Sequence, residues 1–381
     1  VPQGEPVQVR TDRTVNFNWI FALPHPALDA NGFSVVWTGS VVMPRTMDGC
    51  IGLSTQDSMR LYVDDKLLID GWGKEKSADQ ALDFHFEAGR AYKIRIEFVN
   101  DRRGARVIFG YSAGRENFPA AVEAARKADV AILCMGDNEE TSGENFDRTD
   151  LNLPGRQLEL VQAVYATGTP VVLVLQSGRP VTANWENDHL PAILEAWFPG
   201  EQGGTAIAKT LFGDAAPGGR LPITFPRSVG QIPCHYSRRP GGGKRYVEMD
   251  WLPLYPFGYG LTYTTFAYRD MTLSRSVIDP QDTVTVSVTV TNTGKYTGDA
   301  VPQLYVRDMF SSVVKPERQL AAFRRLTLAP GESRRVELTV GPKQLRTLGP
   351  DYVWRVEPGK FELQLGDNAE NILLRADLTV E

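Results

Sequence analysis

The chain has 381 residues, enough for two or three domains, and its contents of 42% hydrophobic and 23% charged residues are ordinary for a folded protein. A formal net charge of −5 gives no reason to expect nucleic acid or an anionic membrane surface as a partner. The sequence shows neither a membrane-spanning apolar run nor a signal-peptide pattern, so no membrane partner is predicted.

Residues 1–113 have the pattern of an all-β domain. Hydrophobic residues alternate with polar ones, which is typical of strands with one buried face; the first such run is Tyr92, Ile94, Ile96 and Phe98. The run Met59–Ile69 predicts two strands joined by a tight turn at two adjacent aspartates.

Residues 114–265 alternate between helical and strand patterns. We expect helices at 118–127, 154–166 and 203–211, and strands at 130–135, 171–175 and 192–197. This alternation predicts an α/β domain with a parallel sheet and helices on its faces. Cys134 lies inside the first strand and is expected to be a small buried side chain. Residues 238–243, RRPGGG, predict a mobile loop.

Residues 266–381 return to short alternating strands, such as those at 284–290, 336–340 and 361–365, and predict a β-sandwich. Three separated cysteines and four histidines without ligand spacing predict no metal site and no disulfide framework. No cofactor is expected.

The stretch from Asp137 to Gly155 is the strongest candidate for chemistry. Five carboxylates fall within eleven residues after an apolar strand, and Ser142 and Gly143 make the segment turn-prone. A solvated acidic loop is the simplest interpretation of such a charge run. However, the loop follows a strand and ends in Leu-Pro-Gly before a helix, and loops at strand ends in open α/β sheets often carry functional groups. The five are Asp137, Glu139, Glu140, Glu144 and Asp147.

Several motifs in order resemble the C-terminal half of family 3 glycoside hydrolases of the β-glucosidase type. They are SGENFDR with LNLPG, LVLQSGRPV (173–181), AWFPGEQGGTAIAKTLFGDAAPGGRLPITFP (196–226) and KRYVEMDWLPLYPFGYGLTYT (244–264). The last region resembles the fibronectin type III-like domain of that family. The first resembles a PA14 domain, in VNFNW (15–19), FSVVWTG (33–39) and DSMRLYVDDKLLIDGW (57–72).

The resemblance implies roles for individual residues. Glu144 matches the general acid/base of the family, with Glu139 and Glu140 as runners-up, and Asp147 with Arg148 would brace the loop. Asn145 stands where the family usually has Gly, and Phe146 where it has Tyr. Trp197 and Trp251 are candidates for sugar contact, although core packing explains them as well. A PA14-type calcium site is not predicted.

The resemblance also implies that this chain lacks one of the two catalytic carboxyl groups, the nucleophile. The family's Asp nucleophile lies on a barrel domain in a Ser-Asp-Trp context, and no Ser-Asp-Trp occurs in this chain. We therefore expect an upstream barrel-containing chain as partner, because the first strand of the PA14-like domain and the first strands of the α/β sheet would also lie upstream.

The expected function is an exo-acting retaining β-glucosidase that hydrolyses β-D-glucosides, with secretion expected and a cytoplasmic location or homodimerisation left open. The alternatives are a β-xylosidase or β-N-acetylhexosaminidase of the same family, or a non-catalytic carbohydrate-binding assembly.

Overall fold

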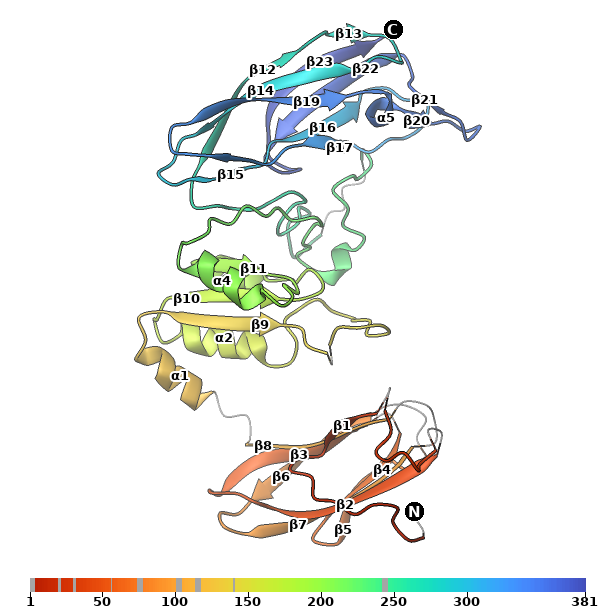
Figure 1. Ribbon diagram of the computed structural model, residues 1–381, viewed down its shortest axis with the longest axis vertical. Coiled ribbons are helices and arrows are strands. Elements are labelled where there is room, and N and C mark those ends of the chain that lie inside the picture. Colours follow the sequence, from red (N-terminus) through yellow and green to blue (C-terminus); the bar gives the residue numbers. More distant parts are fainter. Residues whose placement is uncertain are drawn as a thin grey trace. The chain divides into compact units, whose positions relative to one another are not determined.

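The computed structural model describes residues 4–19, 22–29, 32–55, 57–73, 78–100, 105–113, 118–139, 141–241 and 246–381. By internal contacts the chain divides into two compact units, Val1–Pro119 and Ala120–Glu381 (Figure 1). None of the helices in the described ranges is long and apolar enough to cross a membrane.

The first unit contains two antiparallel four-stranded sheets, in the orders β1-β8-β3-β6 and β2-β7-β4-β5. The expected run from Tyr92 to Phe98 lies in β7 with its alternate side chains at most 5% exposed, although Glu97 between the last two is buried as well, at 3%. Asp64 and Asp65 form the expected turn, with φ values of 48° and 65°. The strands are β1 (Asn16–Asn18), β2 (Phe33–Val42), β3 (Met47–Thr55), β4 (Ser58–Val63), β5 (Lys66–Asp70), β6 (Ala78–Phe86), β7 (Ala91–Asn100) and β8 (Arg106–Ala113).

A three-stranded parallel sheet opens the second unit, in the order β11-β10-β9. Its strands are β9 (Ala131–Gly136), β10 (Val171–Gln176) and β11 (Ala192–Glu195), and Figure 1 shows helices flanking it. Val161 and Val164 of one helix pack with Leu173 and Leu175 of the central strand to form the core of this layer. The helices are α1 (Pro119–Arg126), α2 (Gln157–Tyr165), α3 (Asn184–His189), α4 (Gly203–Leu211) and the 3₁₀ turn η1 (Val229–Gln231).

Four details of this layer differ from the sequence expectations. Helix α2 begins at residue 157 because Gly155, at φ +61°, turns the chain first. Strand β11 stops at residue 195 because Trp197 has φ +52°. Cys134 is exposed, because β9 is an edge strand of the described sheet and Ile132, on the same face, is 43% exposed. Helix α3, which has few apolar residues, was not predicted.

The C-terminal part of the second unit is the expected β-sandwich. Its main sheets have the orders β12-β14-β19 and β13-β23-β22-β16-β17. In β14 the four valines from Val284 to Val290 are fully buried while the intervening residues are partly exposed, the period-2 pattern of a strand with one core face. The elements are β12 (Phe266–Leu273), β13 (Val277–Ile278), β14 (Val284–Asn292), β15 (Gly298–Ala300), β16 (Gln303–Asp308), β17 (Gln319–Phe323), β18 (Leu326–Leu328), β19 (Ser333–Val340), α5 (Pro342–Leu345), β20 (Thr347–Leu348), β21 (Trp354–Arg355), β22 (Gly359–Gly366) and β23 (Ile372–Val380).

A buried hydrogen bond joins the sandwich to the segment before it. The Nε2 of Gln303 donates to the carbonyl oxygen of Gly258 at 2.9 Å and to that of Asp367 at 2.6 Å. A Cβ on Gly258 would lie 2.0 Å from the Oε1 of Gln303, so only glycine permits this approach.

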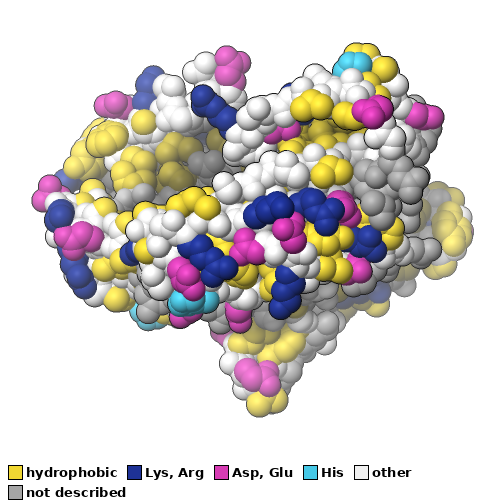
Figure 2. Space-filling view, turned by 90° about the horizontal axis from the view of Figure 1, so that it is seen from below, with side chains coloured by type: hydrophobic (Ala, Val, Ile, Leu, Met, Phe, Trp, Pro, Cys, Tyr) yellow, Lys and Arg dark blue, Asp and Glu magenta, His cyan; other side chains and the backbone are white. Residues whose placement is uncertain are grey.

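On the surface visible in Figure 2, basic and acidic side chains are interspersed and form no field of a single sign.

Candidate active site

The carboxyl ends of the three parallel strands meet at one edge of the sheet. In the strand register, Gly136 lies opposite Gln176, and Leu175 lies opposite Glu195. The residues that follow each strand therefore share this edge, where ligand sites concentrate in open α/β sheets. The carboxylate loop, residues 137–155, leaves from β9 at this point.

Asp137 anchors the loop to the sheet. Its side chain is 1% exposed, and its Oδ1 accepts hydrogen bonds from the Nη1 of Arg148 at 3.1 Å and from the Oγ1 of Thr141 at 3.0 Å. The Oδ2 of Asp137 lies 3.8 Å from the Nε of Arg179. The backbone N–H of Asp137 donates to the carbonyl oxygen of Gln176 at 2.9 Å. A buried carboxylate between two guanidinium groups is a structural anchor, because its charge is already compensated.

Arg148 contacts several parts of the loop, but its neighbour Asp147 is not among its partners. Besides Asp137, it donates to the carbonyl oxygen of Asn152 at 2.7 Å and to the Oδ1 of Asp150 at 3.3 Å. Asp147 is exposed, so the expected pair of neighbouring residues is replaced by a pair eleven residues apart. Adjacent side chains of an irregular loop point in different directions, whereas the folded loop brings Arg148 back over Asp137.

A tight turn presents Glu144 at the tip of the loop. The backbone N–H of Phe146 donates to the carbonyl oxygen of Gly143 at 3.2 Å, and Asn145 has φ +64°. A positive φ at the third turn residue is the mark of a type II turn, and glycine or asparagine suits that position best. Both terminal nitrogens of the Arg179 guanidinium donate to the carbonyl oxygen of Phe146 at 3.3 Å and fix the far side of the turn.

This turn separates Glu144 from the other candidate acids. Glu144 occupies the second turn position and is exposed, with the anchored residues on both sides holding its backbone. Glu139 is also exposed, but it precedes the turn, and Glu140 lies outside the described residues. The arrangement can present one carboxyl from a fixed backbone to a molecule that approaches the edge of the sheet.

Glu195 is a second carboxyl at this edge, and the sequence reasoning missed it. Its Oε1 accepts the backbone N–H of Trp197 at 2.9 Å, while its Oε2 is buried and has no hydrogen-bond partner. Burial raises the pKa of Glu195 from 4.5 to about 7, partly opposed by that hydrogen bond. The available signal was an acidic residue that ends an apolar strand, AILE, before an aromatic residue.

The loops after β9, β10 and β11 converge on Gly178. A Cβ at this position would lie 2.8 Å from the ring of Phe198 and 3.0 Å from the Oγ of Ser142. The glycine therefore allows an aromatic ring, 56% exposed, to lie beside the turn that carries Glu144. An exposed aromatic ring at this edge of the sheet suits contact with a sugar, and Phe198 was not among the expected contact residues.

The two predicted tryptophans lie in different surroundings. Trp197 is partly buried and packs edge-on against Phe225, with ring centroids 5.7 Å apart. Trp251 is 41% exposed and lies under the guanidinium of Arg238, 4.5 Å from the ring centroid. It lines a separate cavity, so the structure does not bring the two together. Among the described residues, no group of three metal-ligating side chains occurs.

Comparison with known families gives two matches. Residues 31–263 match the Glycosyl hydrolase family 3 C-terminal domain, and residues 300–369 match the Fibronectin type III-like domain.

Similar proteins carry related names. The chain is 45% identical over 302 residues to a beta-xylosidase of Formosa agariphila, covering 76% of this chain and 42% of the relative. It is 43% identical over 263 residues to a periplasmic beta-glucosidase of Salmonella typhimurium, covering 66% and 34%. The crystal structure of a beta-glucosidase from Kluyveromyces marxianus in complex with glucose matches with a TM-score of 0.75 at 28% identity, covering 99% and 48%. The chain thus spans less than half the length of these proteins.

Proposed function

Because this chain belongs to glycosyl hydrolase family 3, we propose that it supplies the general acid/base of a retaining β-glycosidase that removes terminal β-D-glucosyl residues. The observation that carries the proposal is the turn at residues 143–146, which presents Glu144, while the exposed ring of Phe198 and Ser142, the residue before the turn, both approach Gly178. The names of the similar proteins, beta-glucosidase and beta-xylosidase, support the reaction class.

The reaction requires two carboxyl groups about 5–5.5 Å apart. A nucleophilic carboxylate bonds to the anomeric carbon while the bond from that carbon to the leaving oxygen breaks, and Glu144 gives its proton to that oxygen. In the second step Glu144 takes a proton from water, whose oxygen bonds to the anomeric carbon and releases the enzyme carboxylate.

The nucleophile in this proposal is an aspartate on an upstream barrel. The sequence has no Ser-Asp-Trp, and the similar proteins are more than twice as long as their matched segments. The exposure of Ile132 in β9 and of Val130 just before it, 43% and 45%, supports a sheet that is covered or continued by further parts of the enzyme. The division at residues 113 and 265, with a PA14-like first domain, belongs to the same proposal.

A β-xylosidase is the second candidate, because the relative with 45% identity bears that name. Rates on aryl β-glucosides and aryl β-xylosides, measured with the intact enzyme, separate the two. A higher kcat/KM for the xyloside would replace the glucosidase assignment. A periplasmic or extracellular location is proposed from the name of the Salmonella relative alone.

The substitution Glu144→Gln in the intact enzyme tests the proposed role and the alternative of a carbohydrate-binding assembly without catalysis. Turnover of substrates with poor leaving groups should fall by about 10²–10⁴-fold, the usual contribution of a general acid. Activated aryl glycosides should lose far less, because their departure needs no proton, and azide should restore activity as an external nucleophile.

Glu139→Gln is the matched control, since it removes an exposed carboxyl of the same loop. Equal turnover in Glu144→Gln and the parent would remove Glu144 from the mechanism. A parent enzyme that binds glucosides but hydrolyses none would favour the binding assembly instead.

A further inference from the structure

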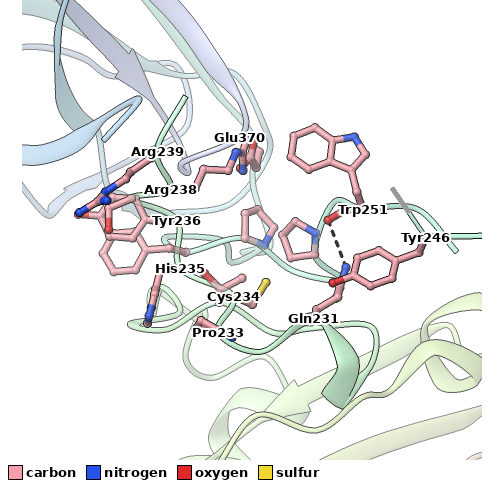
Figure 3. Close-up of a pocket in the computed structure, with 15 residues that line it drawn as sticks. Gln231, Pro233, Cys234, His235, Tyr236, Arg238, Arg239, Tyr246, Trp251 and Glu370 are labelled. Carbon is pink, nitrogen blue, oxygen red and sulfur yellow. Dashed lines mark hydrogen bonds and ion pairs between the residues drawn. The ribbon is translucent and has the colours of Figure 1, made fainter. Parts of the chain in front are cut away.

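An open cavity of about 310 Å³ lies between residues 224–257 and Glu370 in the β22–β23 turn. Figure 3 shows Tyr246 and Trp251 toward one end of it and His235 and Arg239 toward the other. The carboxylate loop at residues 137–155 contributes nothing to its lining.

Hydrogen bonds and ring contacts hold the walls of this cavity. The Nε2 of Gln231 lies within hydrogen-bond distance of three consecutive backbone carbonyl oxygens, at residues 250–252, the shortest contact being 3.2 Å to Trp251. The hydroxyl of Tyr246 donates to the carbonyl oxygen of Gly230 at 3.1 Å. The ring of Tyr236 stacks on Phe257 with centroids 4.2 Å apart. A site whose walls are already fixed requires little ordering when a ligand binds.

The expected mobile loop is pinned at its first residue. Arg238 forms ion pairs with Glu317 at 3.2 Å and with Glu370 at 2.6 Å, while residues 242 and 243 of that loop lie outside the described residues. Two carboxylates compensate the charge of this guanidinium, so it does not provide an unpaired cation for an anionic ligand. Arg239 lies at the exposed end of the cavity and is a second cation of its lining, while Glu370 is the carboxylate among the lining residues.

The lining therefore combines aromatic faces with hydrogen-bond donors and acceptors, and it contains charged groups of both signs. A neutral polyhydroxylated ring would place its C–H groups on aromatic carbon and its hydroxyls on the polar groups. We propose that this cavity is a binding site for a neutral saccharide, with Trp251 and Tyr246 against the ring and Arg239 and Glu370 at the hydroxyls.

Titration of the full chain with cellobiose and with xylobiose, followed by calorimetry, tests this site. The substitution Trp251→Ala should weaken binding at least tenfold, about 1.4 kcal/mol. The matched control is Trp354→Ala, because Trp354 is 54% exposed and also lies under a guanidinium, that of Arg346 at 4.4 Å, but outside the cavity. This control should bind like the parent.

Arg239→Ala provides a second variant that removes an exposed side chain, and it should also weaken binding, by several-fold. The inference fails if neither disaccharide binds saturably at millimolar concentration, if Trp251→Ala binds like the parent, or if Trp354→Ala loses as much as Trp251→Ala. It also fails if digalacturonate, an anionic disaccharide, binds more tightly than cellobiose. Binding at the proposed catalytic loop would respond to Glu144→Ala and not to Trp251→Ala, so the two proposals fail separately.

Discussion

Removal of the carboxyl of Glu195 should change how the stability of the chain depends on pH. Burial raises the pKa of this group in the folded chain from 4.5 to about 7. The folded state therefore binds a proton more tightly than the unfolded state, and its stabilising effect is complete below about pH 4.5 and lost as pH rises through 7. At about 1.36 kcal/mol for each pKa unit, this displacement corresponds to roughly 3 kcal/mol.

Glu195→Gln keeps an oxygen for the backbone N–H of Trp197 and cannot ionise. The buried amide nitrogen costs stability at every pH, so the informative quantity is the difference between variant and parent. Urea unfolding between about pH 5 and pH 8 should show the parent losing roughly 3 kcal/mol relative to the variant. Glu201→Gln, which removes an exposed carboxyl nearby, is the control. Parallel profiles for Glu195→Gln and the parent would refute the reasoning.

Three further substitutions test the site and the core. Asn145→Ala should destabilise the folded chain by about 1 kcal/mol in urea unfolding while Asn145→Gly should not, because φ +64° is strained for alanine; equal effects would contradict the turn. Arg148→Met leaves the buried carboxylate of Asp137 with one distant cation and should lower the free energy of unfolding by about 3 kcal/mol. The double variant with Asp137→Asn should recover part of this stability, and no recovery would contradict the pairing of Arg148 with Asp137. Leu363→Ala, at a fully buried position of β22, should cost about 2–5 kcal/mol in thermal unfolding, and a smaller cost would mean that the sandwich core collapses around the gap.

Local patterns predicted much of the fold. Two kinds of feature could be predicted because they depend on residues close together in the sequence. They are the alternation in β7 and β14 and the turn at two adjacent aspartates between β4 and β5. Cys134 shows the limit of this reasoning, because an apolar run does not reveal which of its faces a neighbouring element covers. The six residues of α3, NWENDH, lack an apolar stripe, and a helix fixed mainly by its tertiary setting leaves no periodic signal.

The candidate site was predicted in its position but not in its contacts. The loop at the end of β9 could be found from its carboxylates, and the resemblance to a known family selected Glu144 among them. The partners of Arg148 and the burial of Glu195 depend on residues that only the fold brings near, so spacing along the chain could not supply them. Asn145 departs from the glycine usual in the family, and its φ explains the exchange, since both residues adopt the left-handed region.

The bonds from Arg238 to Glu317 and Glu370, and from Gln303 to Gly258, set a limit on recombining this chain with others. A C-terminal sandwich grafted onto a foreign α/β layer would lack Arg238 as the ion-pair partner of Glu317 and Glu370, and the Gln303 amide would lose one of its two carbonyl acceptors. Domain exchange should therefore succeed only when residues 224–258 are transferred together with the sandwich.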